Sequence, residues 1–187
     1  MDLGLKNKRV IITGGSKGIG SSVADFFEKE GSLLTLISRD KNLLKKKISK
    51  YKNYQSKHNF FSCNLRNENN PTEVAQKIIK ENKKIDIVIH NVGGGLGVKN
   101  YLDSKDKWID VWNFNVGIAI EMNNIFLPHM IKKKTGKIIH VSSINAESGG
   151  TMMKPYGGAP AYTCAKAYLN MYVKVVGREV AKSNIIM

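Results

Sequence analysis

Short apolar segments of strand length alternate with longer, helix-like segments along almost the whole chain. The short segments are rich in β-branched residues and end at glycine or polar residues, which is typical of β-strands. Runs that are apolar at nearly every position indicate strands buried on both faces of a parallel sheet. The expected strands occupy residues 8–13, 32–38, 58–65, 84–92, 136–143 and 184–187.

The segments between the expected strands have helical spacing. Residues 18–31, for example, place apolar side chains at positions 19, 23, 26 and 27 and end at a glycine, as helices commonly do. Proline removes a hydrogen bond from a helix interior, so we expect Pro128 to kink or break the fourth helix. The expected helices occupy residues 18–31, 40–54, 71–82, 104–133 and 161–183, and an irregular loop is expected over 144–160.

The alternation of strands and helices predicts βαβ units. The predicted fold is therefore of the α/β class, with helices on both faces of a doubly wound parallel sheet. The sequence contains no internal repeat, linker or low-complexity tail. Residues 1–187 are accordingly predicted to form a single domain.

The composition is ordinary except for a formal net charge of +15. Such a charge is compatible with binding to nucleic acid or another anionic partner. Lysines cluster in residues 41–52 and 131–137, but leucine and isoleucine interrupt the first cluster as in an amphipathic helix. Arginine, which suits forked phosphate recognition, occurs only at positions 9, 39, 66 and 178. We interpret the lysines as solvated surface and predict no nucleic-acid partner, with nucleic-acid binding as an open alternative.

The two cysteines, Cys63 and Cys164, form no C-x-x-C motif. Neither a disulfide framework nor a zinc site is therefore indicated, and no metal ligand is predicted. Reduced thiols are typical of the cytoplasm. No apolar run approaches the ~20 residues that cross a bilayer, and the first residues lack the apolar segment of a signal peptide. We expect a cytoplasmic protein that does not associate with membranes.

The stretch TGGSKGIG, residues 13–20, lies between the first expected strand and the first expected helix. A P-loop requires lysine and a hydroxyl residue directly after its last glycine, whereas Lys17 precedes Gly18. The setting favours a dinucleotide-binding turn, in which Gly14 permits a tight exit from the strand, Gly18 lets the backbone approach a diphosphate and Gly20 allows close helix packing. The helix N-terminus would attract the phosphates. A purely structural glycine turn is the open alternative.

The end of the second expected strand bears on the choice of dinucleotide. NAD sites commonly carry Asp or Glu there, which binds the ribose 2′-hydroxyl, but this chain has Ser38 and Arg39. Arginine pairs with a 2′-phosphate, which a carboxylate would repel, and Lys17 is a second cation within reach. We interpret the following Asp40 as the cap of the next helix. The pattern favours NADP(H) over NAD(H).

Tyr162 and Lys166 lie four residues apart in PAYTCAKAY, residues 160–168, so on a helix they share a face. A free tyrosine has a pKa of about 10, too high for efficient proton transfer near neutral pH. A neighbouring ammonium group stabilises the phenolate. Such a pair alone is common on protein surfaces, so its meaning depends on the motifs that accompany it.

Taken together, these motifs resemble the short-chain dehydrogenase/reductase family over essentially the whole chain. The resemblance implies a Rossmann-type fold and reversible hydride transfer between a nicotinamide cofactor and a small-molecule carbonyl or alcohol. The motifs that carry it are, in chain order, T-G-x-x-x-G-x-G at 13–20, HNVGG at 90–94, Asn115 within WNFNVG, the pair Ser142-Ser143, and Tyr162 with Lys166.

The resemblance also implies catalytic roles. Tyr162 is expected to protonate the carbonyl oxygen in reduction and to act as the base in oxidation. Lys166 would hold the nicotinamide ribose and bias Tyr162 toward phenolate, and Ser143 would hydrogen-bond the substrate oxygen. Asn115 would keep a helix locally open and hold a water that links Lys166 to solvent.

The resemblance further assigns a cofactor site. Asn91 and Gly93 are expected to line the adenosine side of the cleft and to stabilise the central sheet. The complete set of expected cofactor-binding residues is Thr13, Gly14, Ser16, Lys17, Gly18, Ile19, Gly20, Ser38, Arg39, Asn64, Leu65, Asn91, Val92, Gly93, Tyr162 and Lys166.

The chain departs from the family pattern at several positions. His90 replaces the first Asn of N-N-A-G, and we interpret it as a buried strand residue rather than a catalyst. Asn64 stands where the family has an Asp that contacts adenine, a contact that an amide can keep. The loop between Ser143 and Tyr162 is longer than usual and is expected to shape the substrate pocket, with Glu147 near its edge.

Family members continue through a sixth strand, a Pro-Gly turn, a substrate-covering segment and a seventh strand. Because this sequence stops at Met187, inside the expected sixth strand, we expect a C-terminally truncated member that lacks the last strands. Relatives often pair through helices that correspond to 104–133 and 161–183, so the full-length protein is expected to be a homodimer or homotetramer. The alternative function is a non-catalytic nucleotide-binding module or an inactive fragment of such an enzyme.

Overall fold

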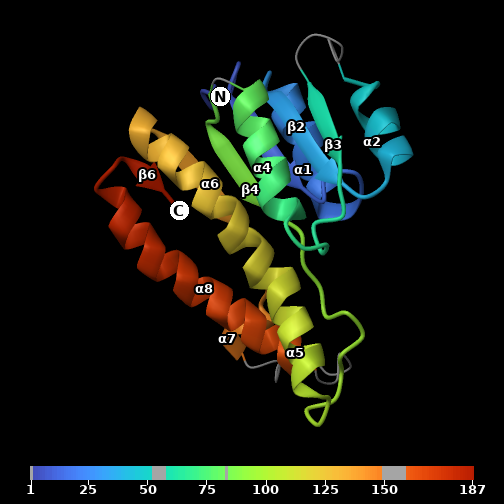
Figure 1. Cartoon of the computed structure of the whole chain (residues 1–187). Coiled ribbons are helices and arrows are strands. Elements are labelled where there is room, and N and C mark those ends of the chain that lie inside the picture. Colours follow the sequence, from blue (N-terminus) through green and yellow to red (C-terminus); the bar gives the residue numbers. More distant parts are fainter. Residues whose placement is uncertain (1, 52–57, 83, 149–158) are drawn as a thin grey trace.

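The computed structural model describes residues 2–51, 58–82, 84–148 and 159–187 (Figure 1). Its centre is a sheet of six parallel strands in the order β3-β2-β1-β4-β5-β6. The expected parallel α/β architecture is therefore confirmed, and each expected strand segment contains one observed strand. The strands are β1 Arg9–Thr13, β2 Leu33–Ser38, β3 Asn59–Ser62, β4 Ile87–His90, β5 Gly136–His140 and β6 Ile185–Ile186.

The strand order reverses beside β1. From β1 the chain proceeds outward to β2 and β3, and then returns to place β4 on the other side of β1. In such open parallel sheets, ligands bind in the crevice beyond the carboxyl ends of the strands at this switch point. The topology therefore directs attention to the ends of β1 and β4, where Thr13 and His90 lie.

Helices cover both faces of the sheet, as Figure 1 shows. On one face Ile11 of β1 packs in a core that contains Ile78 and Phe126, and on the other face Val10 packs in a core that contains Leu44. This two-sided burial explains why the strands are apolar at successive positions. The helices are α1 Gly18–Lys29, α2 Lys41–Ile48, α4 Asn70–Glu81, α5 Lys105–Trp112, α6 Ile118–Lys133, α7 Asn145–Ser148 and α8 Pro160–Ala181.

Within the described ranges, no helix combines the length and the apolar character that spanning a membrane requires.

The second expected helix is shorter than its lysine-rich pattern suggested. We expected a helix over 40–54, but α2 ends at Ile48, and residues 52–57 lie outside the described part of the chain. The chain turns after Ile48 because Tyr51 is buried, and its hydroxyl donates a hydrogen bond to Asp25 Oδ1 at 3.2 Å on α1. Tertiary contact thus overrides the helical pattern at this position.

The fourth expected helix is interrupted at a different position from the one we predicted. We expected a kink or break at Pro128, but α6 continues through Pro128 to Lys133. The prediction of a break there was wrong, and the two neighbouring side chains Phe126 and Met130 are fully buried in the core. Their packing offsets the roughly 3 kcal/mol that proline costs inside a helix. The interruption instead lies between α5 and α6, where residues Asn113–Gly117 form a π-helical turn.

The long connection between β5 and α8 is described only in part. We expected an irregular loop over 144–160, but residues Asn145–Ser148 form the single helical turn α7. Residues 149–158 of the expected loop lie outside the described residues, and Pro160, its expected last residue, already belongs to α8.

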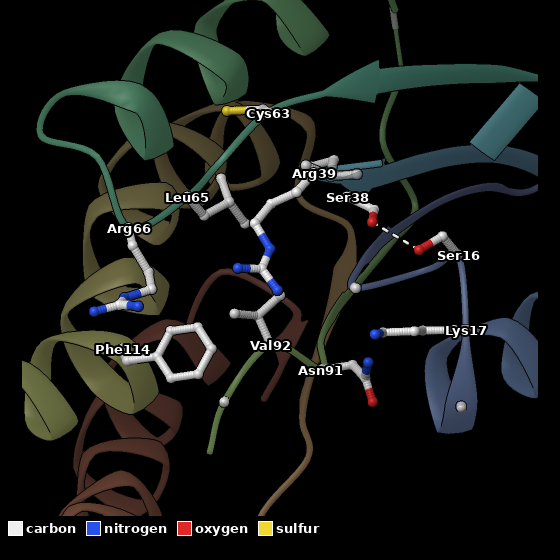
Figure 2. Close-up of a pocket in the computed structure, with 14 residues that line it drawn as sticks. Ser16, Lys17, Ser38, Arg39, Cys63, Leu65, Arg66, Asn91, Val92 and Phe114 are labelled. Atoms are coloured by element: carbon white, nitrogen blue, oxygen red, sulfur yellow. Dashed lines mark hydrogen bonds between the residues drawn. The ribbon is translucent and has the colours of Figure 1, made fainter. Parts of the chain in front are cut away.

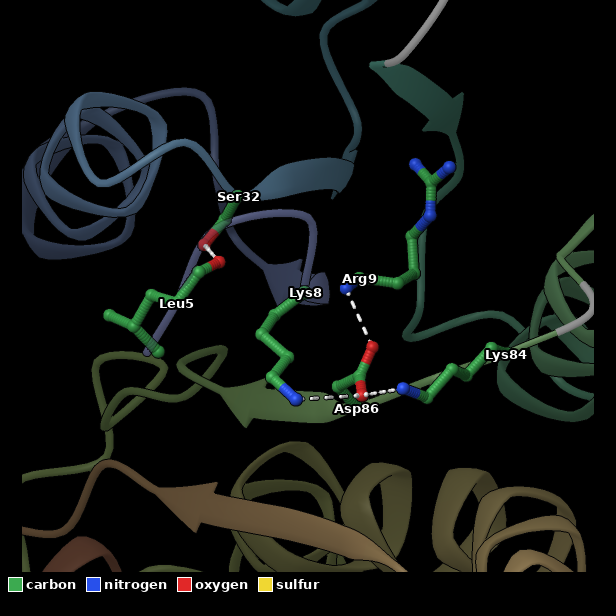
Figure 3. A network of polar contacts seen from close by, with 6 residues as sticks. All are labelled: Leu5, Lys8, Arg9, Ser32, Lys84 and Asp86. Atoms are coloured by element: carbon green, nitrogen blue, oxygen red, sulfur yellow. Dashed lines mark hydrogen bonds and ion pairs between the residues drawn. The ribbon is translucent and has the colours of Figure 1, made fainter. Parts of the chain in front are cut away.

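A buried carboxylate joins the amino-terminal ends of β1 and β4 (Figure 3). Asp86 is only 7% exposed, and its Oδ2 accepts a hydrogen bond from the Arg9 backbone N–H at 2.9 Å. Its Oδ1 pairs with Lys84 Nζ at 2.9 Å and with Lys8 Nζ at 3.8 Å. A buried charge is tolerated when it is paired and hydrogen-bonded in this way, and these contacts help to fix the register of the two strands that position the site.

Candidate functional site

A cavity of about 330 Å³ lies at the carboxyl ends of the central strands (Figure 2). It is bordered by the turn between β1 and α1, by the end of β2 and by the segment after β4. This is the crevice that the strand order predicts. The expected cofactor-binding residues that line it are Gly14, Ser16, Lys17, Gly18, Ser38, Arg39, Leu65, Asn91, Val92 and Gly93.

The glycines of the turn after β1 have the backbone conformations that the motif requires. Gly14 and Gly18 have φ values of +69° and +57°, in the region that favours glycine. A Cβ atom on Gly20 would collide with the carbonyl oxygen of Gly14 and would lie 2.6 Å from Asn91 Nδ2. Helix α1 can therefore begin close to the end of β1, with its N-terminus facing the cavity.

Thr13 and Asn91 join the ends of β1 and β4. Thr13 is buried, and its Oγ1 accepts hydrogen bonds from the backbone N–H groups of Asn91 and Val92 at 3.0 and 3.2 Å. The Asn91 side chain returns a bond from Nδ2 to the Thr13 carbonyl oxygen at 3.2 Å. Thr13 thus supports the cavity from beneath, whereas Asn91 both lines it and stabilises the sheet.

Positive charge and paired hydroxyl groups gather at the β2 side of the cavity. Figure 2 shows the side chains of Lys17 and Arg39 extending into it. The hydroxyl oxygens of Ser16 and Ser38 lie 2.7 Å apart. Asp40 caps α2 by accepting a hydrogen bond from the Leu43 N–H at 2.9 Å, as its position in the sequence predicted. Its carboxylate is therefore engaged by the helix.

The expected cofactor-binding residues that do not line this cavity are Thr13, Ile19, Gly20, Asn64, Tyr162 and Lys166. The Asn64 side chain is turned toward its own loop, where Nδ2 donates to Asn67 Oδ1 at 2.9 Å and Oδ1 accepts from the Arg66 N–H at 3.3 Å. Ile19 lies in the first turn of α1 with 64% of its surface exposed.

Sequence reasoning missed four side chains that line the cavity, those of Ile37, Cys63, Arg66 and Phe114. The Arg66 guanidinium carbon lies 5.7 Å from the centroid of the Phe114 ring, within the range of a cation–π contact. Burial raises the pKa of the Cys63 thiol, and the nearby Lys77 partly opposes this effect. Arg66 directly follows Leu65 and Phe114 directly precedes Asn115, so their proximity to expected site residues was the available signal.

Tyr162 and Lys166 lie one turn apart near the start of α8. The Lys166 side chain is 3% exposed, and its Nζ donates a hydrogen bond to the Val141 carbonyl oxygen at 2.8 Å. The same Nζ lies 5.8 Å from the centroid of the Tyr162 ring. Burial lowers the pKa of Lys166 to about 8, because desolvation disfavours the charged form.

Asn115 brings the π-helical turn against the segment after β4. It is 2% exposed, and its Nδ2 donates to the carbonyl oxygens of Val111 and Gly94, each at 2.8 Å. The Gly94 N–H donates back to Asn115 Oδ1 at 3.0 Å. A Cβ on Gly93 would lie 2.6 Å from Asn115 Oδ1 and 3.1 Å from Lys166 Nζ. Gly93, Asn115 and Lys166 therefore meet, as the sequence order suggested.

Ser143 lies beside a second cavity of about 860 Å³ between β5 and α8. Its Oγ accepts a hydrogen bond from the Asn145 N–H at 3.3 Å. The neighbouring Ser142 Oγ donates to Asn170 Oδ1 at 2.6 Å on α8. Glu147, expected at the edge of the substrate pocket, also lines this second cavity.

Sequence comparison links the chain to oxidoreductases. The family described as short chain dehydrogenase matches residues 8–187. The chain is 29% identical over 185 residues to 3-oxoacyl-(acyl-carrier-protein) reductase FabG of Chlamydia pneumoniae, covering 99% of this chain and 72% of that protein. It is 28% identical over 183 residues to a fatty acyl-CoA reductase of Acinetobacter baylyi, covering 97% of this chain and 60% of that protein. The chain thus spans less than two thirds of the second relative.

Solved structures have the same architecture. L-sorbose reductase from Gluconobacter frateurii, complexed with NADPH and L-sorbose, superposes with a TM-score of 0.86 at 28% identity, covering 99% of this chain and 68% of the other. An NADH-dependent reductase, A1-R′, complexed with NAD, superposes with a TM-score of 0.85 at 26% identity, covering 99% of this chain and 78% of the other. Both nicotinamide dinucleotides are therefore represented among the similar structures.

Proposed function

Since the chain belongs to the short-chain dehydrogenase/reductase family, we propose that the protein transfers hydride between a nicotinamide dinucleotide and a carbonyl or secondary alcohol. The observation that carries the proposal is the cluster of Tyr162, Lys166 and Asn115 beside residues 93–95, the glycine segment after β4. A buried lysine one helical turn from a tyrosine is an arrangement that activates a phenol for proton transfer.

The residues of the first cavity fit a dinucleotide. The turn exposes backbone at Gly18, where a Cβ would meet no atom within 4 Å, so that a diphosphate has room to approach. The N-terminus of α1 adds unpaired N–H groups and a favourable dipole. Gly93 lets Asn115 and Lys166 pack closely against the backbone, where a Cβ would collide with Asn115 Oδ1, and Lys166 would there hold ribose hydroxyl groups. When bound, the nicotinamide supplies or accepts the hydride.

Proton transfer at the substrate oxygen is assigned to Tyr162. In reduction its hydroxyl group protonates the developing alkoxide, and in oxidation its phenolate removes the alcohol proton. Lys166 remains mostly charged below its lowered pKa of about 8, so its ammonium group favours the phenolate at neutral pH. Ser143 would donate a hydrogen bond to the same substrate oxygen. Asn115 fixes the backbone beside Lys166.

Four side chains at the β2 side of the cavity support a preference for NADP(H). Lys17 and Arg39 offer positive charge, and the close pair of Ser16 and Ser38 offers hydroxyl groups. Charge-assisted hydrogen bonds to a phosphate are stronger than neutral ones. The carboxylate that follows Arg39, that of Asp40, accepts a hydrogen bond from α2.

Replacing Lys17 or Arg39 with alanine is expected to weaken NADPH binding by about tenfold each, because a hydrogen bond to a charged group contributes roughly 1.5–3 kcal/mol. NADH binding should change little, so the preference for NADPH would fall. Dissociation constants for both nucleotides, measured by the fluorescence of the reduced nicotinamide, test this prediction. Lys50→Ala removes an exposed lysine outside the cavity and is the matched control. An unchanged ratio of the two constants would contradict the assignment.

The activity itself is tested with a panel of ketones, aldehydes and secondary alcohols. NADPH consumption or formation at its absorption maximum should reveal turnover with at least one class of compound. Cofactor binding without turnover, for this chain and for any longer form of the protein, would favour a non-catalytic nucleotide-binding module instead.

Exposed apolar side chains on α8 support the proposal that the protein forms a homodimer or homotetramer. Tyr168, Met171 and Val175 recur at helical spacing and are 49%, 58% and 55% exposed in the single chain. Ile109 of the neighbouring α5 is 42% exposed. Contiguous apolar exposure of this kind marks interaction surfaces. Light scattering of the purified protein tests the assembly.

A further inference from the structure

Two histidines stack next to Lys166, His90 being buried and His140 half-buried beside the second cavity. His90 ends β4 and His140 ends β5, and the two residues are paired in the parallel register. Their rings lie 4.7 Å apart between centroids with an interplanar angle of 21°. His90 is 5% exposed, which agrees with its interpretation as a buried strand residue. Neither ring takes part in the proposed proton transfer, yet both lie at the carboxyl ends of the strands, where the candidate site is formed.

A buried amide connects the two rings. Asn123 of α6 is fully buried, and its Oδ1 lies 2.9 Å from His90 Nε2. Its Nδ2 lies 3.4 Å from His140 Nε2 and donates to the Tyr172 hydroxyl at 3.1 Å on α8. The Tyr172 ring also meets His140 edge-on, with centroids 6.0 Å apart. The four side chains therefore join the ends of both strands to α6 and α8, two helices that pack on the same face of the sheet.

These contacts specify one neutral tautomer for each histidine. Because Asn123 Oδ1 is an acceptor, His90 carries its proton on Nε2, and because Asn123 Nδ2 is a donor, His140 Nε2 must be unprotonated. Neutral His140 then carries its proton on Nδ1, which has no hydrogen-bond partner among the described residues. A second proton on His140, on Nε2, would face the Asn123 Nδ2 donor, so the network disfavours the charged form.

The electrostatic surroundings favour the same neutral state. Burial lowers the pKa of His90 to about 4, although its contact with Asn123 opposes this effect. Burial lowers the pKa of His140 to about 2, and the charges of His90 and Lys166 add to that effect. The titratable groups that act on or contact His140 are thus His90 from β4, and Lys166 and Tyr172 from α8.

The stack is connected to Lys166 through one residue, Val141. Val141 directly follows His140, and its N–H donates to the His90 carbonyl oxygen at 2.9 Å. The carbonyl oxygen of Val141 accepts the hydrogen bond from Lys166 Nζ at 2.8 Å. Any shift between the ends of β4 and β5 would therefore move the acceptor of the Lys166 ammonium group.

We propose that His90 and His140 are positioning residues for the reaction: the stacked neutral pair, joined by Asn123, holds the Val141 carbonyl where it accepts the hydrogen bond of Lys166. The inference rests on the proposed hydride-transfer function, because Lys166 matters through its effect on Tyr162. The effect of the histidine stack on Lys166 can be measured as a change in the Lys166 pKa, which does not require turnover.

The test compares the titration of Lys166 in the parent chain and in His140→Phe. With lysine labelled at the ε-carbon, NMR should show one lysine that titrates near pH 8, and its signal should be missing in Lys166→Met. His140→Phe keeps a ring for the stack but removes the nitrogen that meets Asn123. The ammonium group then loses a well-placed acceptor, so the pKa of Lys166 should fall further, by about half a pH unit or more. His140→Gln, which retains a polar group, should restore part of the shift.

Two further variants keep the test decisive. Asn82→Ala removes a different buried amide, one that donates to the Ile78 carbonyl at the end of α4, and it should leave the Lys166 pKa unchanged. Tyr172→Phe removes a single oxygen from the network and should lower the Lys166 pKa by a smaller amount. This variant replaces His140→Phe in the test if His140→Phe does not fold. Folded variants of His140 and Tyr172 that leave the Lys166 titration unchanged would overturn the proposal.

Turnover provides a second readout. His140→Phe should lower kcat by about tenfold with little change in KM, since a small displacement of a reacting group is costly. A purely structural role would lower the melting temperature and leave both the Lys166 pKa and kcat unchanged. If neither this chain nor a longer form of the protein shows turnover, the proposed function fails, whereas the NMR titration still decides whether the stack positions Lys166.

Discussion

Replacing Tyr162 with phenylalanine is expected to lower kcat for hydride transfer by about three orders of magnitude, within the range that positioned acid–base groups contribute. The variant keeps the ring beside Lys166 but has no proton to give to a carbonyl oxygen and no phenolate to accept one. Turnover should be measured with the substrate that the carbonyl panel identifies. The dissociation constant for NADPH should change by less than about threefold, because the nucleotide cavity is lined by other residues.

Tyr168→Phe is the matched control for this prediction. Tyr168 lies on the same helix but is 49% exposed, and its ring meets Trp112 edge-on at 5.5 Å between centroids. Loss of its hydroxyl should leave kcat close to that of the parent. Undiminished turnover in Tyr162→Phe would remove Tyr162 from the mechanism, even if the protein still reduced carbonyl compounds.

The strands of the sheet could be predicted because the apolar pattern that indicates each strand lies within a few consecutive residues. Strands such as β1 are apolar at consecutive positions, and the segments between them have helical spacing, so composition along the chain indicates both element types. Helix ends were less predictable because tertiary contacts decide them. The lysine-rich pattern after Asp40 continues beyond Ile48, yet burial of Tyr51 against Asp25 turns the chain away.

The interruption of the fourth expected helix illustrates the same limit. Pro128 is the obvious local signal, but α6 passes through it. The π-helical turn around Asn115 depends on hydrogen bonds to Gly94, which lies 21 residues earlier in the chain. No local pattern shows such a contact. The role that family resemblance assigns to Asn115, that of keeping a helix locally open, is compatible with this turn.

The candidate site shows which parts of a binding cavity a motif can predict. The glycine turn was identifiable because a dinucleotide-binding site needs glycines between the first strand and the first helix. Lys17 and Arg39 were identifiable because each is a cation at a position within reach of a 2′-phosphate. Arg66 and Phe114 could not be identified in this way, because they come together only through a contact between residues 48 positions apart in the sequence. The histidine stack was hidden for a similar reason, since His90 and His140 become neighbours only through strand pairing.

Replacing Gly20 with alanine is expected to weaken NADPH binding by roughly 10- to 100-fold. The added Cβ would collide with the Gly14 carbonyl oxygen and would lie 2.6 Å from Asn91 Nδ2. A side-chain amide can move, but the carbonyl belongs to the backbone of the turn that faces the cofactor cavity. Relief of the collision must therefore separate α1 from the end of β1, and overpacking of this kind costs roughly 1–3 kcal/mol.

Gly177→Ala makes the same chemical change where the structure has room for it. Gly177 lies within α8, and a Cβ there would be 3.5 Å from Met187 Cβ, an ordinary contact. Alanine is favoured over glycine in a helix by about 1 kcal/mol, so this variant should bind NADPH as the parent does and melt at the same or a higher temperature. Nucleotide titration and thermal unfolding of both variants distinguish a local effect at the turn from a general effect of alanine. If Gly20→Ala bound NADPH as tightly as Gly177→Ala, close packing of α1 on the strand end would not be what shapes the cofactor site.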